Sequence, residues 1–307
     1  MKNLFSTPAG MLLLALTGLA HPASAEEKEL SYQFEDTRRL VSLVEEAADL
    51  MEKDGTGAFT EFGEKNSRWL DDDHYLFVYT LDGTCVFHPM APELVGRNLM
   101  SMRDMDGKPV IQYITQIGQQ SGPDAAGWVF YLWEEGTQLM PSWKSSYIRK
   151  VIAPDGLIYL VGSGLYTLKM EQAFVQERVD WAVAELKAQG TTAAFDEFRS
   201  PASRFSFLGT YIFVMDMTGR ALVDPSYPTL VGRSLNAFQD VSGRFIVREM
   251  IEKLQKSDRA WVQYLWPRPG ESLPSRKLAY VRKAKVGPNW LIVGCDFFMA
   301  SPIWMKM

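Results

Sequence analysis

The stretch Tyr211–Leu235, YIFVMDMTGRALVDPSYPTLVGRSL, has an earlier counterpart in Tyr75–Leu99, YLFVYTLDGTCVFHPMAPELVGRNL. The two align without a gap at an offset of 136 residues. Both run from an aromatic strand through a glycine turn to a Pro-x-Leu-Val-Gly-Arg loop. The spacing is longer than the roughly 20–50 residues of a solenoid repeat. The sequence therefore predicts a duplicated domain.

The repeat extends to both sides of this stretch. Upstream, Phe59 and Phe62 match Phe195 and Phe198 at the same offset. Downstream the offset becomes 133 after one deletion. We therefore expect one domain over residues 26–166 and a second over residues 167–307. The matched downstream residues are Trp128, Tyr131, Trp133, Lys144 and Tyr147 in the first half, against Trp261, Tyr264, Trp266, Lys277 and Tyr280 in the second.

Residues 1–25 have the pattern of a secretory signal peptide. Lys2 supplies a positive start, Met11–Ala20 is a short apolar run, and Ala-Ser-Ala at 23–25 is an A-x-A cleavage site. No later stretch approaches the ~18 uninterrupted apolar residues of a membrane span. We expect a soluble exported protein, periplasmic if its source is a Gram-negative bacterium. An uncleaved anchor is the alternative.

The composition is that of a globular chain with a mild negative charge. Hydrophobic residues make up 47% of the 307 residues, and the formal net charge is −5. This charge argues against nucleic acid or an anionic membrane as the main partner. The two cysteines, Cys85 and Cys295, fall in different halves, which favours two buried thiols. An exported compartment would also permit a disulfide, so their redox state stays open.

Apolar periodicity and turn residues outline the same elements in each half. Helical spacing over Leu40–Met51 ends at Gly55, and its counterpart over about Leu168–Gln189 ends at Gly190. A hairpin, a short helix and three aromatic, β-branched runs follow in each half. This order predicts an α+β fold in which a long N-terminal helix packs on one face of a five-stranded antiparallel sheet.

At these residues the chain resembles the Cache family of extracytoplasmic sensor domains, which have a PAS-like fold. The second half has the Tyr-x-Phe-Val strand, the Leu-x-Gly-x-x-Leu loop, the Asp-x-x-Gly segment and Tyr-Leu-Trp-Pro at 264–267. The first half keeps most of these features, adds His88-Pro89 and departs at residues 134–136. The resemblance implies tandem single-Cache domains that bind small carboxylates or amino acids. Family members usually continue into a membrane helix and a signalling module; this sequence carries neither, so we expect a membrane receptor or kinase as partner.

Strand alternation places Tyr131 and Trp133 on one face of their strand, and Tyr264 and Trp266 on one face of theirs. Each pair could form an apolar pocket wall with polar tips, or could fill the core. Lys144 and Lys277 could each bind a ligand carboxylate, or could lie solvated at a sheet edge.

His88 and its counterpart Asp224 differ in charge, so we expect the two halves to bind different ligands. His88 could donate to a carboxylate, although a lone histidine is more often structural. Asp224 favours a zwitterion or amine in the second half. The candidate ligand-binding residues are His88, Tyr131, Trp133, Lys144 and Tyr147, and Asp224, Tyr264, Trp266, Lys277 and Tyr280.

No catalytic signature stands out in the sequence. A nucleophile elbow, a phosphate loop and zinc-type His/Cys spacing are all missing, so we expect neither an enzyme nor a cofactor or metal. The sequence favours an exported sensory protein that binds small organic anions or amino-acid-like ligands. The main alternative is a periplasmic adaptor or structural subunit that acts by protein contact alone.

Overall fold

The computed structural model describes residues 31–71, 74–135, 139–268 and 271–299. Residues 32–307 belong to one compact unit, and the description below concerns the described part of it. The predicted signal peptide lies outside the described residues. No helix within these ranges is long and apolar enough to cross a membrane.

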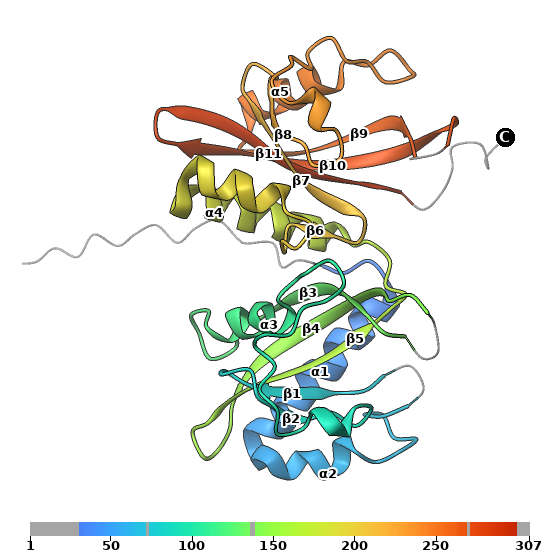
Figure 1. The fold of residues 1–307 in the computed structure, drawn as a ribbon. Coiled ribbons are helices and arrows are strands. Elements are labelled where there is room, and N and C mark those ends of the chain that lie inside the picture. The colour runs from blue at the N-terminus through green and yellow to red at the C-terminus, as the bar shows by residue number, and fades with distance from the viewer. Residues whose placement is uncertain (1–30, 72–73, 136–138, 269–270, 300–307) are drawn as a thin grey trace, which may run out of the picture. The chain divides into compact units, whose positions relative to one another are not determined.

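The first half folds into a five-stranded antiparallel sheet with the strand order β2-β1-β5-β4-β3. Three α-helices belong to this half (Figure 1). The elements in chain order are α1 (Glu35–Asp54), α2 (Phe59–Phe62), β1 (Phe77–Thr80), β2 (Cys85–Phe87), α3 (Val110–Gly118), β3 (Ala126–Trp133), β4 (Ser142–Ile152) and β5 (Ile158–Leu165).

The second half repeats this topology. Its sheet has the order β6-β7-β11-β10-β9, with β8 also paired to β7, so five strands correspond to those of the first half and β6 is added. The sequence did not predict this two-residue strand. The elements are α4 (Gln172–Arg199), β6 (Ser206–Phe207), β7 (Thr210–Asp216), β8 (Ala221–Val223), α5 (Ile246–Lys256), β9 (Arg259–Pro267), β10 (Pro274–Val286) and β11 (Asn289–Phe298).

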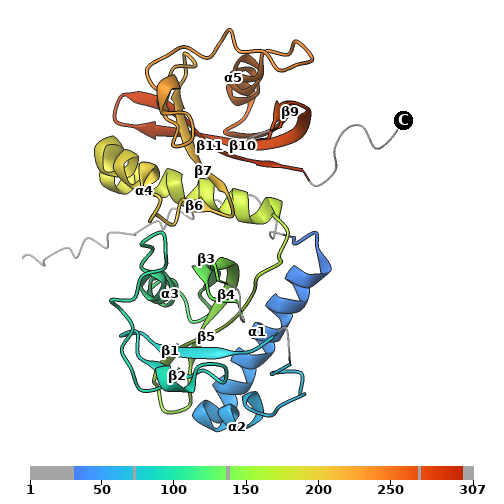
Figure 2. The same cartoon turned by 45° about the vertical axis from the view of Figure 1, so that its right-hand side comes forward.

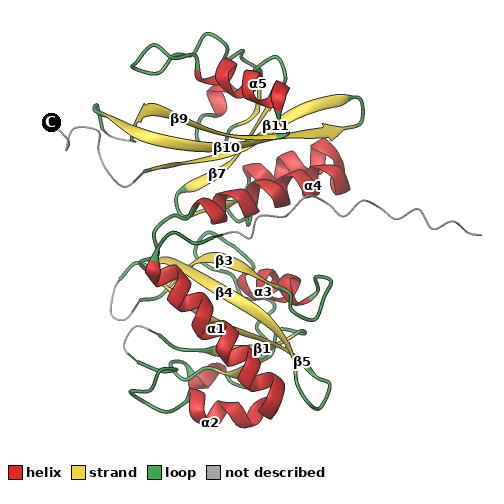
Figure 3. Cartoon of the chain, turned by 180° about the vertical axis from the view of Figure 1, so that it is seen from behind, coloured by secondary structure: helices red, strands yellow, loops and turns green. Residues whose placement is uncertain are grey.

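Each sheet is covered on both faces. The long helix α1 lies along one face of the first sheet and α3 lies on the other, and α4 and α5 cover the second sheet in the same way (Figures 1 and 2). Seen from behind, α1 and α4 run across their strands (Figure 3). The predicted long helix on an antiparallel sheet is therefore confirmed. The shorter helices α3 and α5 cover the opposite faces of the two sheets.

Glycine ends both long helical runs where the sequence predicted. Gly55 follows α1 with φ 56°. Gly190 interrupts α4 with φ 78° and ψ 176°, a backbone conformation that side-chain-bearing residues rarely adopt. The residues after Gly190 form a separate helical segment, as the match of Phe195 and Phe198 to the α2 residues predicted.

Several buried polar contacts join residues of the two halves. The ammonium of Lys108, which is fully buried, donates to the backbone carbonyls of Pro201, Ser203 and Ser206 at 2.6–2.8 Å. The carboxylate of Glu171 accepts hydrogen bonds from two backbone N–H groups at the start of the first half. These bonds give partners to backbone groups of both halves that lie partly or wholly out of contact with water.

The two cysteines are free thiols, and both are fully buried. Cys85 belongs to the apolar cluster between the first sheet and α3. Cys295 lies in the second sheet, on the face that α4 covers, which corresponds to the α1 face of the first sheet. Burial raises the pKa of Cys85 to about 11 and that of Cys295 to about 12.

Candidate functional site

The first candidate site lies on the α3 face of the first sheet. Tyr131 on β3 pairs with Lys144 on β4, and both side chains belong to the face whose apolar residues pack against α3. Trp133 lies two residues after Tyr131 and contacts its ring at 5.7 Å between centroids. The structure thus places Tyr131 and Trp133 on one face of their strand, as alternation predicted, and brings Lys144 and His88 beside them in the same cavity.

Lys144 is buried without a counter-ion. Its side chain is 1% exposed, and among the described residues it forms no ion pair. Its ammonium donates to the hydroxyl of Tyr75 and lies 4.2 Å from that ring centroid and 5.1 Å from that of Tyr166. Burial lowers the pKa of Lys144 to about 7. A buried cation in this state is stabilised by any anion that can reach it.

His88 lies between aromatic rings at the edge of this cavity. Its imidazole is 5.2 Å from the ring of Tyr75 and stacks on Phe77 at 6.3 Å. Burial, together with the charge of Lys144, lowers the pKa of His88 to about 4. The neutral ring therefore has one donor and one acceptor nitrogen. Its Nδ1 has no hydrogen-bond partner within the described part of the chain.

An outer cavity leads to this inner site. The space beside Lys144 amounts to about 10 Å³, close to the smallest volume that accepts one water molecule. The outer cavity holds about 870 Å³ and shares Tyr75, His88, Met102 and Trp133 with the inner one. A carboxylate that approaches Lys144 from the outer cavity must therefore displace at least one of these four side chains.

The second half builds a different site at the equivalent place. Lys277 pairs with Tyr264 across β9 and β10, as Lys144 pairs with Tyr131. Here, however, the ammonium of Lys277 lies 2.7 Å from Oδ1 of Asp296 on β11. The hydroxyl of Tyr264 donates to Oδ2 of the same carboxylate at 2.6 Å. Lys277 and Asp296 are 7% and 8% exposed, so the lysine is buried with its own counter-ion.

Asp224 occupies the place of His88 in this second cavity, which measures about 110 Å³. Its Oδ1 accepts a hydrogen bond from the backbone N–H of Tyr227 at 2.9 Å. Burial and the nearby Asp296 raise the pKa of Asp224, and Lys277 opposes this rise. Trp266 also lines the cavity, and its ring centroid lies 6.4 Å from that of Tyr264.

Two of the residues predicted to bind ligand lie elsewhere. Tyr147 faces α1, donates to the carboxylate of Glu45 at 2.7 Å and packs on Trp128. Tyr280 likewise packs on Trp261, on the α4 face of the second sheet. Because Tyr147 lies three positions after Lys144, and Tyr280 three positions after Lys277, alternation along the strand places the tyrosines on the opposite face of the sheet. Neither lines the cavities described above.

Sequence reasoning did not select Asp296, which decides the charge of the second site. In the first half its place is taken by Gly164, as the register shows: Gly162 pairs with Phe77, and Gly294 with Phe213. The signal available in the sequence was an aspartate inside an otherwise apolar strand, at a position where the first half has a glycine. Tyr75, the hydrogen-bond partner of Lys144, was also not selected.

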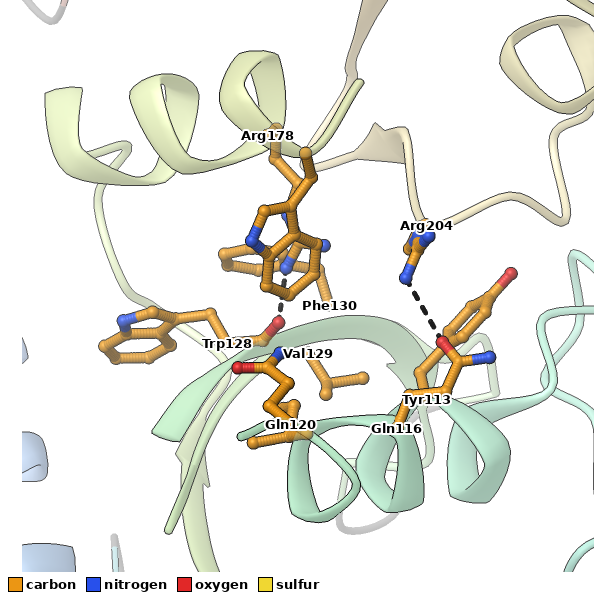
Figure 4. A pocket seen from close by; sticks show the side chains of 10 residues that line it. Tyr113, Gln116, Gln120, Trp128, Val129, Phe130, Arg178 and Arg204 are labelled. Carbon is orange, nitrogen blue, oxygen red and sulfur yellow. Dashed lines mark hydrogen bonds between the residues drawn. The ribbon is translucent and has the colours of Figure 1, made fainter. Parts of the chain in front are cut away.

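A third cavity, of about 150 Å³, lies between α3, β3 and α4 (Figure 4). Its cations already have protein acceptors. Arg178 donates to the carbonyl of Trp128 and stacks on Trp181 at 4.3 Å, and Arg204 donates to the side chains of Gln116 and Glu185. Within the described ranges, no cluster of three or more His, Cys, Asp or Glu side chains could hold a metal ion.

Two family models match the chain in tandem. The model described as "Cache domain" matches residues 65–171. The model described as "Single Cache domain 2" matches residues 166–300. The matched ranges meet near residue 166, where the repeat analysis divides the chain.

Individual relatives cover only parts of the chain. It is 30% identical over 82 residues to the methyl-accepting chemotaxis protein McpP of Pseudomonas putida, which is 27% of this chain and 15% of that protein. A solved periplasmic sensor domain of a chemotaxis protein is 25% identical, with a TM-score of 0.32, over 40% of this chain and 87% of that one. A Cache chemosensory domain solved for its carboxylic acid recognition is 22% identical, with a TM-score of 0.33, over 40% and 85%.

Proposed function

Because the chain is a tandem Cache-domain protein, we propose that it is an exported sensory protein whose first domain binds a small monocarboxylate. Cache domains are extracytoplasmic receptor modules, so a binding role agrees with the family. In this proposal the chain acts in the periplasm, after cleavage of residues 1–25, and passes the bound state to a membrane receptor or kinase.

The observation that carries the proposal is the unpaired charge of Lys144. Its counterpart in the second domain, Lys277, has a carboxylate at 2.7 Å, whereas within the described ranges the ammonium of Lys144 contacts the hydroxyl of Tyr75 and the rings of Tyr75 and Tyr166 and forms no ion pair. Burying an ammonium without a counter-ion costs several kcal/mol in order of magnitude. A ligand carboxylate would supply the missing charge, and the unpartnered Nδ1 of His88 and the hydroxyl of Tyr131 would supply direction.

The surroundings of Lys144 select the size and charge of the ligand. The inner cavity is lined by apolar side chains, including Phe77, Val110 and Ile111, and Lys144 is the cation among its lining residues. The charged residues around the outer cavity are mostly acidic, with Glu93, Glu134 and Glu135 among them. One buried cation behind an acidic entrance favours one carboxylate on a short apolar body, or an amino acid whose ammonium faces outward. It disfavours dicarboxylates.

Calorimetric titration of the purified protein with acetate, propionate, alanine and succinate tests this proposal. We expect binding of at least one of the first three and weaker binding of succinate. Lys144→Met keeps the length of the side chain and removes its charge, so it should lower affinity by about a hundredfold or more, at about 1.4 kcal/mol per factor of ten. The melting temperature should not fall, because a desolvated charge is lost.

Lys150→Met is the matched control. Lys150 lies on the same strand, but it donates to the carbonyl of Gly122 at an exposed position. This variant should bind like the wild type. If Lys144→Met also binds like the wild type, or if no carboxylate in the series raises the melting temperature of the wild type by mass action, the proposal fails. The adaptor role that the sequence left open then becomes the better account.

A further inference from the structure

The second domain keeps the lysine and the aromatic wall of the first, but its lysine is already neutralised. Asp296 pairs with Lys277 at 2.7 Å and accepts the hydroxyl of Tyr264 at 2.6 Å. These are the two groups whose equivalents, Lys144 and Tyr131, are proposed to hold a ligand carboxylate. The side chain of Asp296 thus makes, within the protein, the contacts that a ligand carboxylate is proposed to make in the first domain.

The neighbouring residues explain why only the second domain has this carboxylate. A Cβ at Gly164 would collide with Oγ of Ser146 and lie 3.0 Å from Cε of Lys144. In the second domain the residue at the place of Ser146 is Ala279, which is smaller and bears no hydroxyl. Gly164 with Ser146 leaves Lys144 unpaired, whereas Asp296 with Ala279 fills the equivalent space.

A second carboxylate leaves the second cavity with an excess of negative charge. Asp224 lines the same cavity, and among the described residues it has no cation within ion-pair distance. Its Oδ1 accepts a hydrogen bond from the backbone N–H of Tyr227. Lys277 is paired with Asp296, so two carboxylates and one ammonium line the cavity. Burial and Asp296 raise the pKa of Asp224, and the backbone hydrogen bond from Tyr227 and the charge of Lys277 lower it.

The walls of this cavity suit a cation. Six aromatic side chains line it, and an ammonium or quaternary ammonium group is attracted to aromatic faces as well as to a carboxylate. Two of them, Tyr227 and Phe238, are partly exposed, each at 37%. The six are Tyr211, Phe213, Tyr227, Phe238, Tyr264 and Trp266.

We propose that the second cavity binds a small organic cation, with Asp224 as its counter-ion, and that Asp296 closes this cavity to carboxylates. This inference rests on the proposed function, because it assumes that both domains are ligand-binding modules. It assigns opposite charge preferences to two domains of one chain. The second domain would respond to amines while the first responds to carboxylates.

Titration of the full protein with methylammonium, ethanolamine, choline and putrescine tests the cation site. We expect at least one to bind, with Asp224→Asn lowering its affinity at least tenfold and Lys144→Met leaving it unchanged. Asp258→Asn, at an exposed position in the same half, is the matched control and should bind like the wild type. Unchanged affinity in Asp224→Asn, or no binding by all four amines, overturns the inference.

A second experiment tests the role of Asp296. In the Lys144→Met background, where the first cavity no longer responds, Asp296→Gly should create new binding of acetate or propionate, because Lys277 loses its internal partner. If the double variant retains a cooperative melting transition and gains no carboxylate binding, Asp296 does not close the site. If the wild type binds carboxylates but no amine, the inference fails and the proposed function stands; if it binds neither, both fail.

Discussion

Lys144 and Lys277 show how one residue at one place in a fold can have opposite roles. Both are buried on the same strand of equivalent sheets. One has a carboxylate partner from its own chain and the other has none among the described residues. The difference comes from a single pair of positions, Gly164 and Asp296, on the neighbouring strand.

The buried lysine of the first domain should make ligand binding depend on pH. Its pKa is about 7 in the folded protein against 10.5 for an ordinary lysine. Above pH 7 the ammonium is lost, so carboxylate affinity should fall by about tenfold per pH unit. Calorimetry between pH 6 and 9 in buffers of different ionisation enthalpy should also show proton uptake on binding near pH 7.

The free protein should show the opposite trend. Between about pH 7 and 10.5 the unfolded chain binds more protons at Lys144 than the folded chain, so this group makes stability rise with pH over that range. The groups that face it are Tyr75, Tyr166 and His88, and none carries a compensating negative charge. Both trends should vanish in Lys144→Met. A carboxylate affinity that stays constant from pH 6 to 9 would exclude Lys144 as the charged group.

At this scale the sequence predicted part of the site. Alternation placed Tyr131, Trp133 and their repeats on one face, and the structure agrees. Matching the two halves also selected Tyr147 and Tyr280 as candidate ligand-binding residues. The repeat preserves tyrosines of the core as well as those that line the cavities. Asp296 was not found because its role depends on a neighbouring strand, and pairing across a sheet cannot be read from the spacing within one strand.

At the scale of elements, Gly164 on β5 pairs with Ser146 on β4, and a Cβ added at Gly164 would collide with the Oγ of Ser146. Gly164→Ala should destabilise the protein by about 1–3 kcal/mol through overpacking. The second domain has Ala279 at the place of Ser146, which indicates that alanine at position 146 would make room for the added methyl group. Adding Ser146→Ala should recover part of the loss, so that the double variant is more stable than the sum of the two single effects predicts.

Urea denaturation of the two single variants and the double variant measures this coupling. Ser146→Ala alone should cost about 1 kcal/mol, because the hydroxyl of Tyr131 loses its partner at 2.9 Å. Strictly additive effects would show that the strands separate easily at this point, and that glycine is not required there by packing.

Most elements could be predicted from local signals. Helical periodicity followed by Gly55 and Gly190 located the long helices, and the Gly turns located both hairpins. The strand β6 escaped prediction because it is two residues long and pairs only with the start of β7. The cover of both sheet faces also depends on tertiary packing, since α3 and α5 are short and their docking is not encoded in their own sequence.

At the scale of the whole molecule, we expect the chain to be exported and released. Cleavage after Ala25 should give a product that osmotic shock liberates from cells, because residues 1–25 have the pattern of a signal peptide. N-terminal sequencing of the released protein checks the cleavage site. Recovery of an intact N-terminus in carbonate-washed membranes would instead establish the uncleaved anchor. A variant with Ala23 and Ala25 both changed to Asp is the control and should not be processed.

The two-domain organisation followed from the repeat alone, and the family matches at 65–171 and 166–300 agree with it. The division at residue 166 stays a prediction. What the repeat could not reveal is how the two domains differ in function. The proposed difference rests on three exchanges at otherwise matched positions: His88 against Asp224, Gly164 against Asp296, and Ser146 against Ala279.

Each domain also contains its own reporter group. Cys85 and Cys295 are fully buried, and their raised pKa values make them unreactive in the folded state. A thiol-reactive dye can therefore label each cysteine only when the surrounding core opens. Mass spectrometry of the two cysteine-containing peptides would time these openings separately, in one native sample and without engineered labels. A carboxylate should slow labelling of Cys85, and an amine should slow labelling of Cys295.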